Sequence, residues 1–63
     1  MKIIIDTYNE VIEYPVVNSY FVRSLPKMLV FDYMGTTHNY NLNQVKSVVI
    51  THNNRVVYEY KGE

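Results

Sequence analysis

A chain of 63 residues that contains no cysteine has few ways of stabilising a fold. A domain of about 60 residues buries only about 60% of the surface that its unfolded chain exposes, so small domains often rely on disulfides, metal ions or association. The cysteine count excludes disulfides and thiolate zinc sites. Two histidines without metal-binding spacing predict no metal site, and no cofactor motif is present. We therefore expect residues 1–63 to form one domain that is either tightly packed or a homo-oligomer.

Residue types that favour strands dominate the sequence. Valine, isoleucine and threonine fill 19 positions, and tyrosine and phenylalanine fill nine more. These side chains suit a pleated, half-buried surface. The one helical candidate is a single turn within residues 42–46, where Leu42 and Val45 would both point into the core. The pattern predicts an all-β domain of five or six antiparallel strands in a meander, forming a twisted sheet or a partly open SH3-like or Sm-like barrel.

A hairpin is expected at the start of the chain. A two-residue turn at Asn9-Glu10 would pair residues 2–8 with residues 11–17 and gather the apolar side chains on one face. The same register sets Asp6 opposite Glu13, a like-charge pair that counts against it.

Two prolines mark the next segments. Pro15 cannot donate to a strand ladder, so the second strand should be an edge, a bulge or a bend. A short third strand is expected over residues 20–23. Residues 24–27 should be a connection, because a residue before proline is pushed to extended geometry.

The clearest hairpin pairs residues 28–33 with residues 37–42. Gly35-Thr36 suits a type II′ turn, which favours glycine first. In that register Tyr33 lies opposite His38 and Phe31 opposite Tyr40, so one face collects the large apolar residues.

The last hairpin pairs residues 47–52 with residues 55–60 around Asn53-Asn54, which suits a type I′ turn. One face would hold residues that include Val49, Tyr58 and Tyr60, and the other would hold residues that include Val48 and Ile50. With apolar residues on both faces, we expect this hairpin to be covered by another part of the fold or by a partner chain.

Nine side chains are candidates for an interaction surface. Tyrosine is an amphipathic contact residue that is frequent in binding hot spots, and seven tyrosines in this chain are more than a small core requires. Several of them must nevertheless fill a core that has no tryptophan and three leucines. The candidates are Tyr20, Arg23, Tyr33, His38, Tyr40, His52, Arg55, Tyr58 and Tyr60.

Catalytic motifs are absent from the sequence. There is no G-x-S-x-G, G-x-G-x-x-G or P-loop, and the carboxylates Asp6, Glu10 and Glu13 are typical of a solvated hairpin face. A formal net charge of zero argues against nucleic-acid binding through bulk electrostatics. No stretch approaches the about 20 apolar residues of a membrane span. The sequence therefore predicts a protein that is not an enzyme and does not bind membranes.

Composition also suggests an origin. Many Asn, Ile, Lys and Tyr residues with no alanine are typical of an A/T-rich coding sequence. We expect a small bacterial or phage accessory protein, cytoplasmic and homo-oligomeric, that acts as a protein-binding module and inhibits a host protein. The alternative is an oligomeric binder of nucleotides or single-stranded nucleic acid, in which tyrosines stack on bases beside Arg and Lys.

Residues 40–50 resemble the second half of an Sm-type barrel in their apolar spacing. The glycine-rich signature of that family's first half is absent, so the sequence assigns no family.

Overall fold

The computed structural model describes residues 1–62, which form seven strands and one short 3-10 turn. The all-β prediction is confirmed, with seven strands where the sequence predicted five or six. The elements in chain order are β1 Lys2–Asp6, β2 Val11–Tyr14, β3 Tyr20–Ser24, β4 Lys27–Tyr33, β5 Thr36–Asn41, η1 Leu42–Gln44, β6 Ser47–His52 and β7 Arg55–Lys61.

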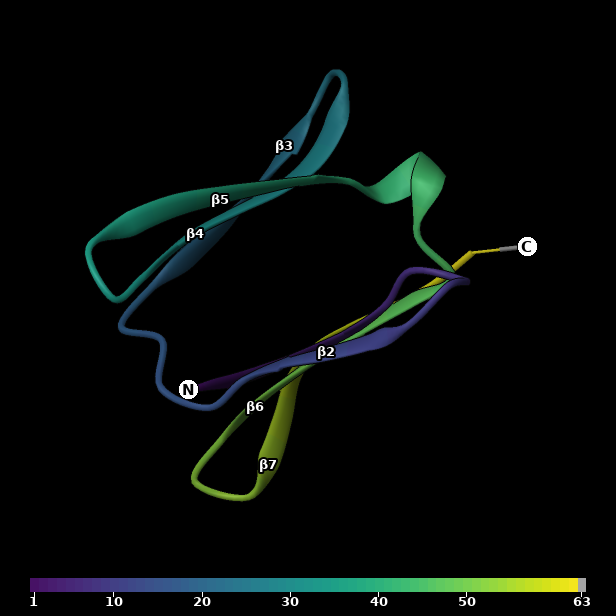
Figure 1. Cartoon of the computed structure of the whole chain (residues 1–63). Coiled ribbons are helices and arrows are strands. Elements are labelled where there is room, and N and C mark those ends of the chain that lie inside the picture. Colours follow the sequence, from purple (N-terminus) through teal and green to yellow (C-terminus); the bar gives the residue numbers. More distant parts are fainter. Residues whose placement is uncertain (63) are drawn as a thin grey trace.

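The strands form two antiparallel sheets that lie as two layers (Figure 1). One sheet has the order β2-β1-β6-β7, and the other has the order β3-β4-β5. Every neighbouring pair is consecutive in the chain except β1 and β6. The turn η1 makes the crossing from β5 in one layer to β6 in the other, and this crossing brings β6 beside β1 (Figure 1).

The core lies between the two layers and takes side chains from both. Leu42 is fully buried and Val45 is 4% exposed, which confirms that this turn points both residues inward. No buried residue of the described chain is polar or charged. The central cluster consists of Ile3, Ile5, Tyr14, Val17, Leu29, Phe31, Leu42, Val45, Val48 and Ile50.

The first hairpin is shifted by two residues from the predicted register. Asp6 lies opposite Val11 and Glu13 lies opposite Ile4, so the like-charge pair is avoided. The loop is longer than predicted, and the amide of Thr7 closes it by donating to the carbonyl oxygen of Glu10 at 2.9 Å. A shift of two keeps every side chain on its predicted face, because side chains alternate with a period of two.

The β4–β5 hairpin differs from the prediction in the same way. Its turn is Met34-Gly35, and both residues have positive φ, 51° and 79°. Two positive φ values define a type I′ turn, so the predicted type II′ turn at Gly35-Thr36 is wrong. Tyr33 now lies opposite Thr36, and Phe31 lies opposite His38.

The β6–β7 turn is confirmed at Asn53-Asn54, with φ values of 54° and 63°. Beyond it, a bulge between Ile50 and Thr51 shifts the register. Tyr58 therefore lies opposite Ile50, and Tyr60 lies opposite Val48. The predicted division of this hairpin is thus wrong beyond the bulge, since both tyrosines join the core side.

Both prolines lie next to strand ends. Strand β2 ends directly before Pro15 and is an edge strand, as predicted. Residues 24–27, which were predicted to be a connection between strands, instead form a tight hairpin turn in which Ser24 pairs with Lys27. Leu25 and Pro26 form its tip through a cis peptide bond.

Candidate functional site

An aromatic group built around Tyr14 joins the two sheets on the side where β2 faces β5. Tyr14 is 8% exposed, and its ring centroid lies 4.8 Å from that of Phe31, 5.0 Å from Tyr33 and 5.1 Å from His38. His38 also stacks on Phe31 at 5.5 Å. The hydroxyl groups of Tyr14 and Tyr40 share a hydrogen bond. Such ring contacts add to the stabilisation that burial provides.

The environment of Tyr40 in this group favours the neutral form of its phenol. Burial, and then the hydrogen bond to Tyr14, raises the pKa of Tyr40 well above its ordinary value of 10.0. Both causes favour the neutral phenol. Its hydrogen bond to Tyr14 connects β5 in one sheet to β2 in the other.

A second aromatic group joins the sheets on the side of β7. The ring centroids of Tyr20 and Tyr58 lie 6.1 Å apart, and the ammonium group of Lys27 lies 5.0 Å from the ring centroid of Tyr60. Burial is the main cause that raises the pKa of Tyr58. These tyrosines pack against the core cluster.

The nine predicted candidates therefore occupy three places. The structure brings Tyr33, His38 and Tyr40 into the first aromatic group. Three more, Tyr20, Tyr58 and Tyr60, belong to the second group. The remaining three candidates are exposed. Arg23 lies on β3, and His52 and Arg55 lie opposite each other beside the β6–β7 turn.

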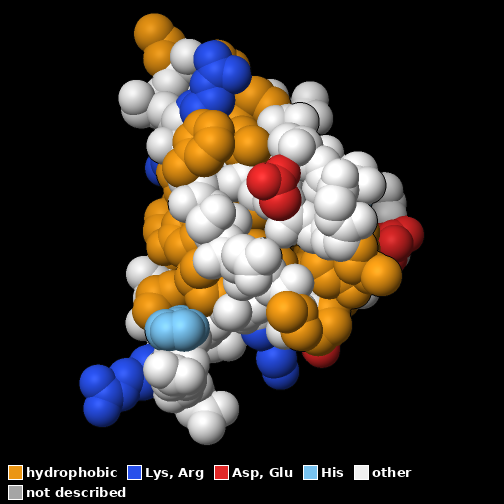
Figure 2. Space-filling view, turned by 90° about the vertical axis from the view of Figure 1, so that its left-hand side faces the viewer, with side chains coloured by type: hydrophobic (Ala, Val, Ile, Leu, Met, Phe, Trp, Pro, Cys, Tyr) orange, Lys and Arg blue, Asp and Glu red, His pale blue; other side chains and the backbone are white. Residues whose placement is uncertain are grey.

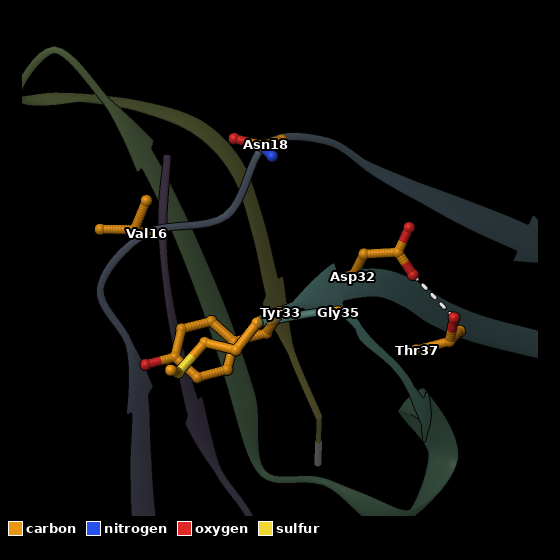
Figure 3. Close-up of a pocket in the computed structure, with 7 residues that line it drawn as sticks. Val16, Asn18, Asp32, Tyr33, Gly35 and Thr37 are labelled. Carbon is orange, nitrogen blue, oxygen red and sulfur yellow. Dashed lines mark hydrogen bonds between the residues drawn. The ribbon is translucent and has the colours of Figure 1, made fainter.

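A hollow of about 680 Å³ opens next to the first aromatic group. It lies between the β2–β3 connection and the end of the β4–β5 hairpin (Figure 3). We call it the hairpin hollow, and its lining consists of Val16, Asn18, Asp32, Tyr33, Met34, Gly35 and Thr37.

The wall from the β2–β3 connection is fixed by Val17. This side chain is 1% exposed, its amide donates to the carbonyl oxygen of Met1 at 2.8 Å, and its own carbonyl oxygen accepts from the N-terminal ammonium group at 3.0 Å. Because Val17 points into the core, its neighbours Val16 and Asn18 point outward along the hollow (Figure 3).

Two exposed apolar side chains lie at the rim of the hairpin hollow. Val16 is 70% exposed and Met34 is 86% exposed, while half-buried Tyr33 connects the hollow to the aromatic group. Figure 2 looks onto the side of the molecule that carries the β4–β5 turn, and hydrophobic side chains gather over much of it. Exposed apolar side chains that adjoin a hollow are typical of contact surfaces.

Met34 also has a backbone conformation that methionine disfavours. Its φ of 51° lies in the left-handed region. Glycine, and to a lesser extent asparagine and aspartate, adopt this region readily, whereas it costs other residues about 1–2 kcal/mol. Its side chain is almost wholly exposed and gains little from packing. Met34 therefore makes the turn less stable than asparagine would, and packing does not offset that cost.

The polar side of the hollow carries one charge. A carboxylate oxygen of Asp32 accepts a hydrogen bond from the hydroxyl group of Thr37 at 2.7 Å (Figure 3). The amide of Asn18 lies on the opposite wall. The lining residues include no lysine or arginine.

Of the residues that line the hollow, only Tyr33 was among the predicted candidates. Val16 lies in the connection after Pro15, and nothing in the sequence places it beside Met34. One signal was available: the first position of a type I′ turn favours asparagine, and this turn has methionine there.

No protein-family model matches the chain, and no curated protein or solved structure is significantly similar to it. Within residues 1–62 no group of three or more His, Cys, Asp and Glu side chains is placed to hold a metal ion. That part of the chain also contains no helix with the length and hydropathy needed to cross a membrane.

Proposed function

We propose that this chain is a non-enzymatic module that binds a segment of a partner protein in the hairpin hollow. The observation that carries the proposal is Met34, an exposed apolar side chain in a left-handed turn at the rim of the hollow. Val16 and Tyr33 add apolar surface to the lining of the same hollow. A partner that covers such side chains gains about 1.5–3 kcal/mol for each one fully buried.

The biological role is a further part of the proposal. Binding of a host protein, with inhibition as the result, is proposed from the amino-acid composition alone, in which many Asn, Ile, Lys and Tyr residues without alanine are typical of an A/T-rich coding sequence. A homo-oligomer in the cytoplasm is proposed on the same compositional grounds, together with the exposed Val56 and Val57 on edge strand β7.

Selection from a displayed peptide library tests the docking proposal. The full chain serves as bait, and the selected peptides are then measured against two variants. Met34→Asn removes the apolar side chain from the rim. Leu25→Ser is the matched control, because Leu25 is 89% exposed in the turn at the opposite end of β4.

We expect peptides that bind the wild type and Leu25→Ser equally and bind Met34→Asn weakly. Failure to select any peptide, or selection of peptides that bind both variants as well as the wild type, would overturn the proposal.

The nucleic-acid alternative has less support. Base stacking requires accessible ring faces. Tyr20, Tyr58 and Tyr60 are half-buried against the core cluster, and the Lys27 ammonium group lies over the Tyr60 ring.

A further inference from the structure

We infer that two copies of this chain associate by pairing their β3 strands antiparallel, which joins their two three-stranded sheets into one continuous sheet. The two-fold axis would pass beside Val22, so that Phe21 of each copy lies opposite Arg23 of the other copy. This inference rests on the homo-oligomer in the proposed function and names the surface that forms it.

Strand β3 is an edge strand that carries a large exposed apolar side chain. It pairs only with β4, so its other edge has backbone N–H and C=O groups that can accept a further strand. Phe21 on this strand is 57% exposed. In Figure 1 the turn end of the β3–β4 hairpin projects away from the four-stranded sheet. Addition of a strand here would pair the free backbone groups and cover the phenylalanine.

The backbone geometry of β3 selects the register. Residues of an antiparallel strand point their N–H and C=O groups alternately toward the neighbouring strand and away from it. The residues that flank a two-residue turn point these groups at each other, and here they are Ser24 and Lys27. Phe21 and Arg23 therefore present their backbone groups to the free edge. A pairing that matches these two residues across a two-fold axis uses all of those groups.

The side chains are self-complementary in this register. Phe21 and Arg23 lie on the same face of β3, because side chains alternate with a period of two. Within the described residues the Arg23 guanidinium group makes no ion pair and lies over no ring. Placed opposite each other, guanidinium group and ring attract, and the symmetry repeats the contact.

The neighbouring registers are less favourable. An axis at Arg23 would set two arginines opposite each other, and like charges in that position are destabilising. An axis at Phe21 would set Arg23 opposite Ser19, which precedes the strand.

The other edge strands are less suited to such pairing. Strand β2 has four residues and stops before Pro15, and β7 is interrupted by its bulge. Strand β5 carries no exposed large apolar side chain. The ring contact between Tyr20 and Tyr58 places β7 on the same side of the molecule as β3, so its two exposed valines are on this side as well.

Sedimentation equilibrium on charge variants tests the pairing. Concentrations should reach about 1 mM, because an interface formed by one strand is small. Phe21→Lys sets like charges opposite each other twice and should weaken the dimer about tenfold or more. The double variant Phe21→Lys/Arg23→Glu sets opposite charges there and should restore it. A dimer that Phe21→Lys leaves unchanged, or that the double variant does not restore, would overturn the inference.

The absence of cysteine from the chain allows a second test of the register. Val22→Cys would place two thiols directly opposite each other at the axis, close enough for a disulfide to form with oxidised glutathione. Val57→Cys is the control on β7, where the side chain is also accessible. We expect Val22→Cys to give a covalent dimer and Val57→Cys to stay monomeric in a denaturing gel. Equal cross-linking of the two variants, or more of Val57→Cys, would overturn the inference.

These outcomes are separable from the proposed function. A dimer that does not depend on Phe21 contradicts the β3 pairing and leaves the homo-oligomer standing, whereas a strictly monomeric wild type contradicts both. Met34→Asn should leave the dimer unchanged, because the hairpin hollow and the free edge of β3 are different surfaces. Docking at the hollow is judged by the selected peptides alone.

Discussion

Replacing Met34 with asparagine should make the protein more stable. Met34 occupies the first central position of a type I′ turn with φ of 51°, and the second position is already Gly35. Asn-Gly is the preferred pair for this turn. Because the left-handed conformation costs an ordinary L-residue about 1–2 kcal/mol, relief of most of that cost should raise the free energy of unfolding by about 1 kcal/mol.

Loss of packing should not cancel this gain, because Met34 is 86% exposed. For a domain of 60–100 residues, 1 kcal/mol corresponds to a rise of about 4–8 °C in the melting temperature. Thermal and urea denaturation followed by circular dichroism would measure it.

The chain supplies its own reciprocal control. Asn53 is exposed at the same first position of the β6–β7 turn, with φ of 54°. Asn53→Met should therefore lower the free energy of unfolding by about 1 kcal/mol. The reasoning is refuted if Met34→Asn is no more stable than the wild type while Asn53→Met is destabilised as expected.

Four further measurements test other parts of the structure and of the proposals. Leu42→Ala removes a fully buried side chain from η1 and should cost about 2–5 kcal/mol in urea denaturation, whereas a loss below 1 kcal/mol would mean that this turn does not support the core. The raised pKa of Tyr40 means that the folded state holds the phenol proton more tightly, so this contribution to stability is complete below pH 10, the unfolded value, and is lost as the pH rises above it. Unfolding measured from pH 8 to pH 11 should show that decline, and Tyr40→Phe should reduce it; an equal decline in both proteins would contradict the assignment. Light scattering should find a mass above that of one chain, and a strictly monomeric species would count against the proposed homo-oligomer. Titration with labelled oligonucleotides at low salt should find no binding, and tight binding would favour the nucleic-acid alternative over the protein-binding module.

The sequence predicted on which face of a strand each side chain lies better than it predicted which residue lies opposite it on the neighbouring strand. Alternation assigned Phe31 and His38 to the same side of their hairpin, and the structure keeps them there. The register was wrong by two residues because a shift of two preserves that alternation and leaves the hydrophobic pattern unchanged. The choice between the registers depended on the turn, where Met34-Gly35 has less obvious turn chemistry than Gly35-Thr36.

The bulge in the last hairpin was not predictable in the same way. The turn at Asn53-Asn54 fixed the pairing near His52 and Arg55 correctly. The irregularity between Ile50 and Thr51 then moved Tyr58 to the core side, where apolar burial outweighs regular pairing. Local sequence carries little signal for such a change, because it depends on what the opposite sheet offers.

The hairpin hollow depends on contacts between segments that are distant in the chain. Val16 is placed by the pairing of Val17 with Met1, and Asp32 is placed by the β4–β5 hairpin. The sequence could propose Tyr33 as a candidate from its type alone, and Tyr33 does line the hollow. It could not identify the hollow, because nothing in the strand patterns determines which loop of one sheet lies beside which turn of the other.

The dissociation constant of a selected peptide tests the docking proposal most directly. Fluorescence anisotropy would measure it for the wild type, Met34→Asn and Leu25→Ser under the same conditions. We predict binding about 10-fold to 100-fold weaker for Met34→Asn, since burial of one such side chain contributes about 1.5–3 kcal/mol, and unchanged binding for Leu25→Ser. Equal affinities for all three proteins, or an equal loss in both variants, would contradict docking at the hairpin hollow.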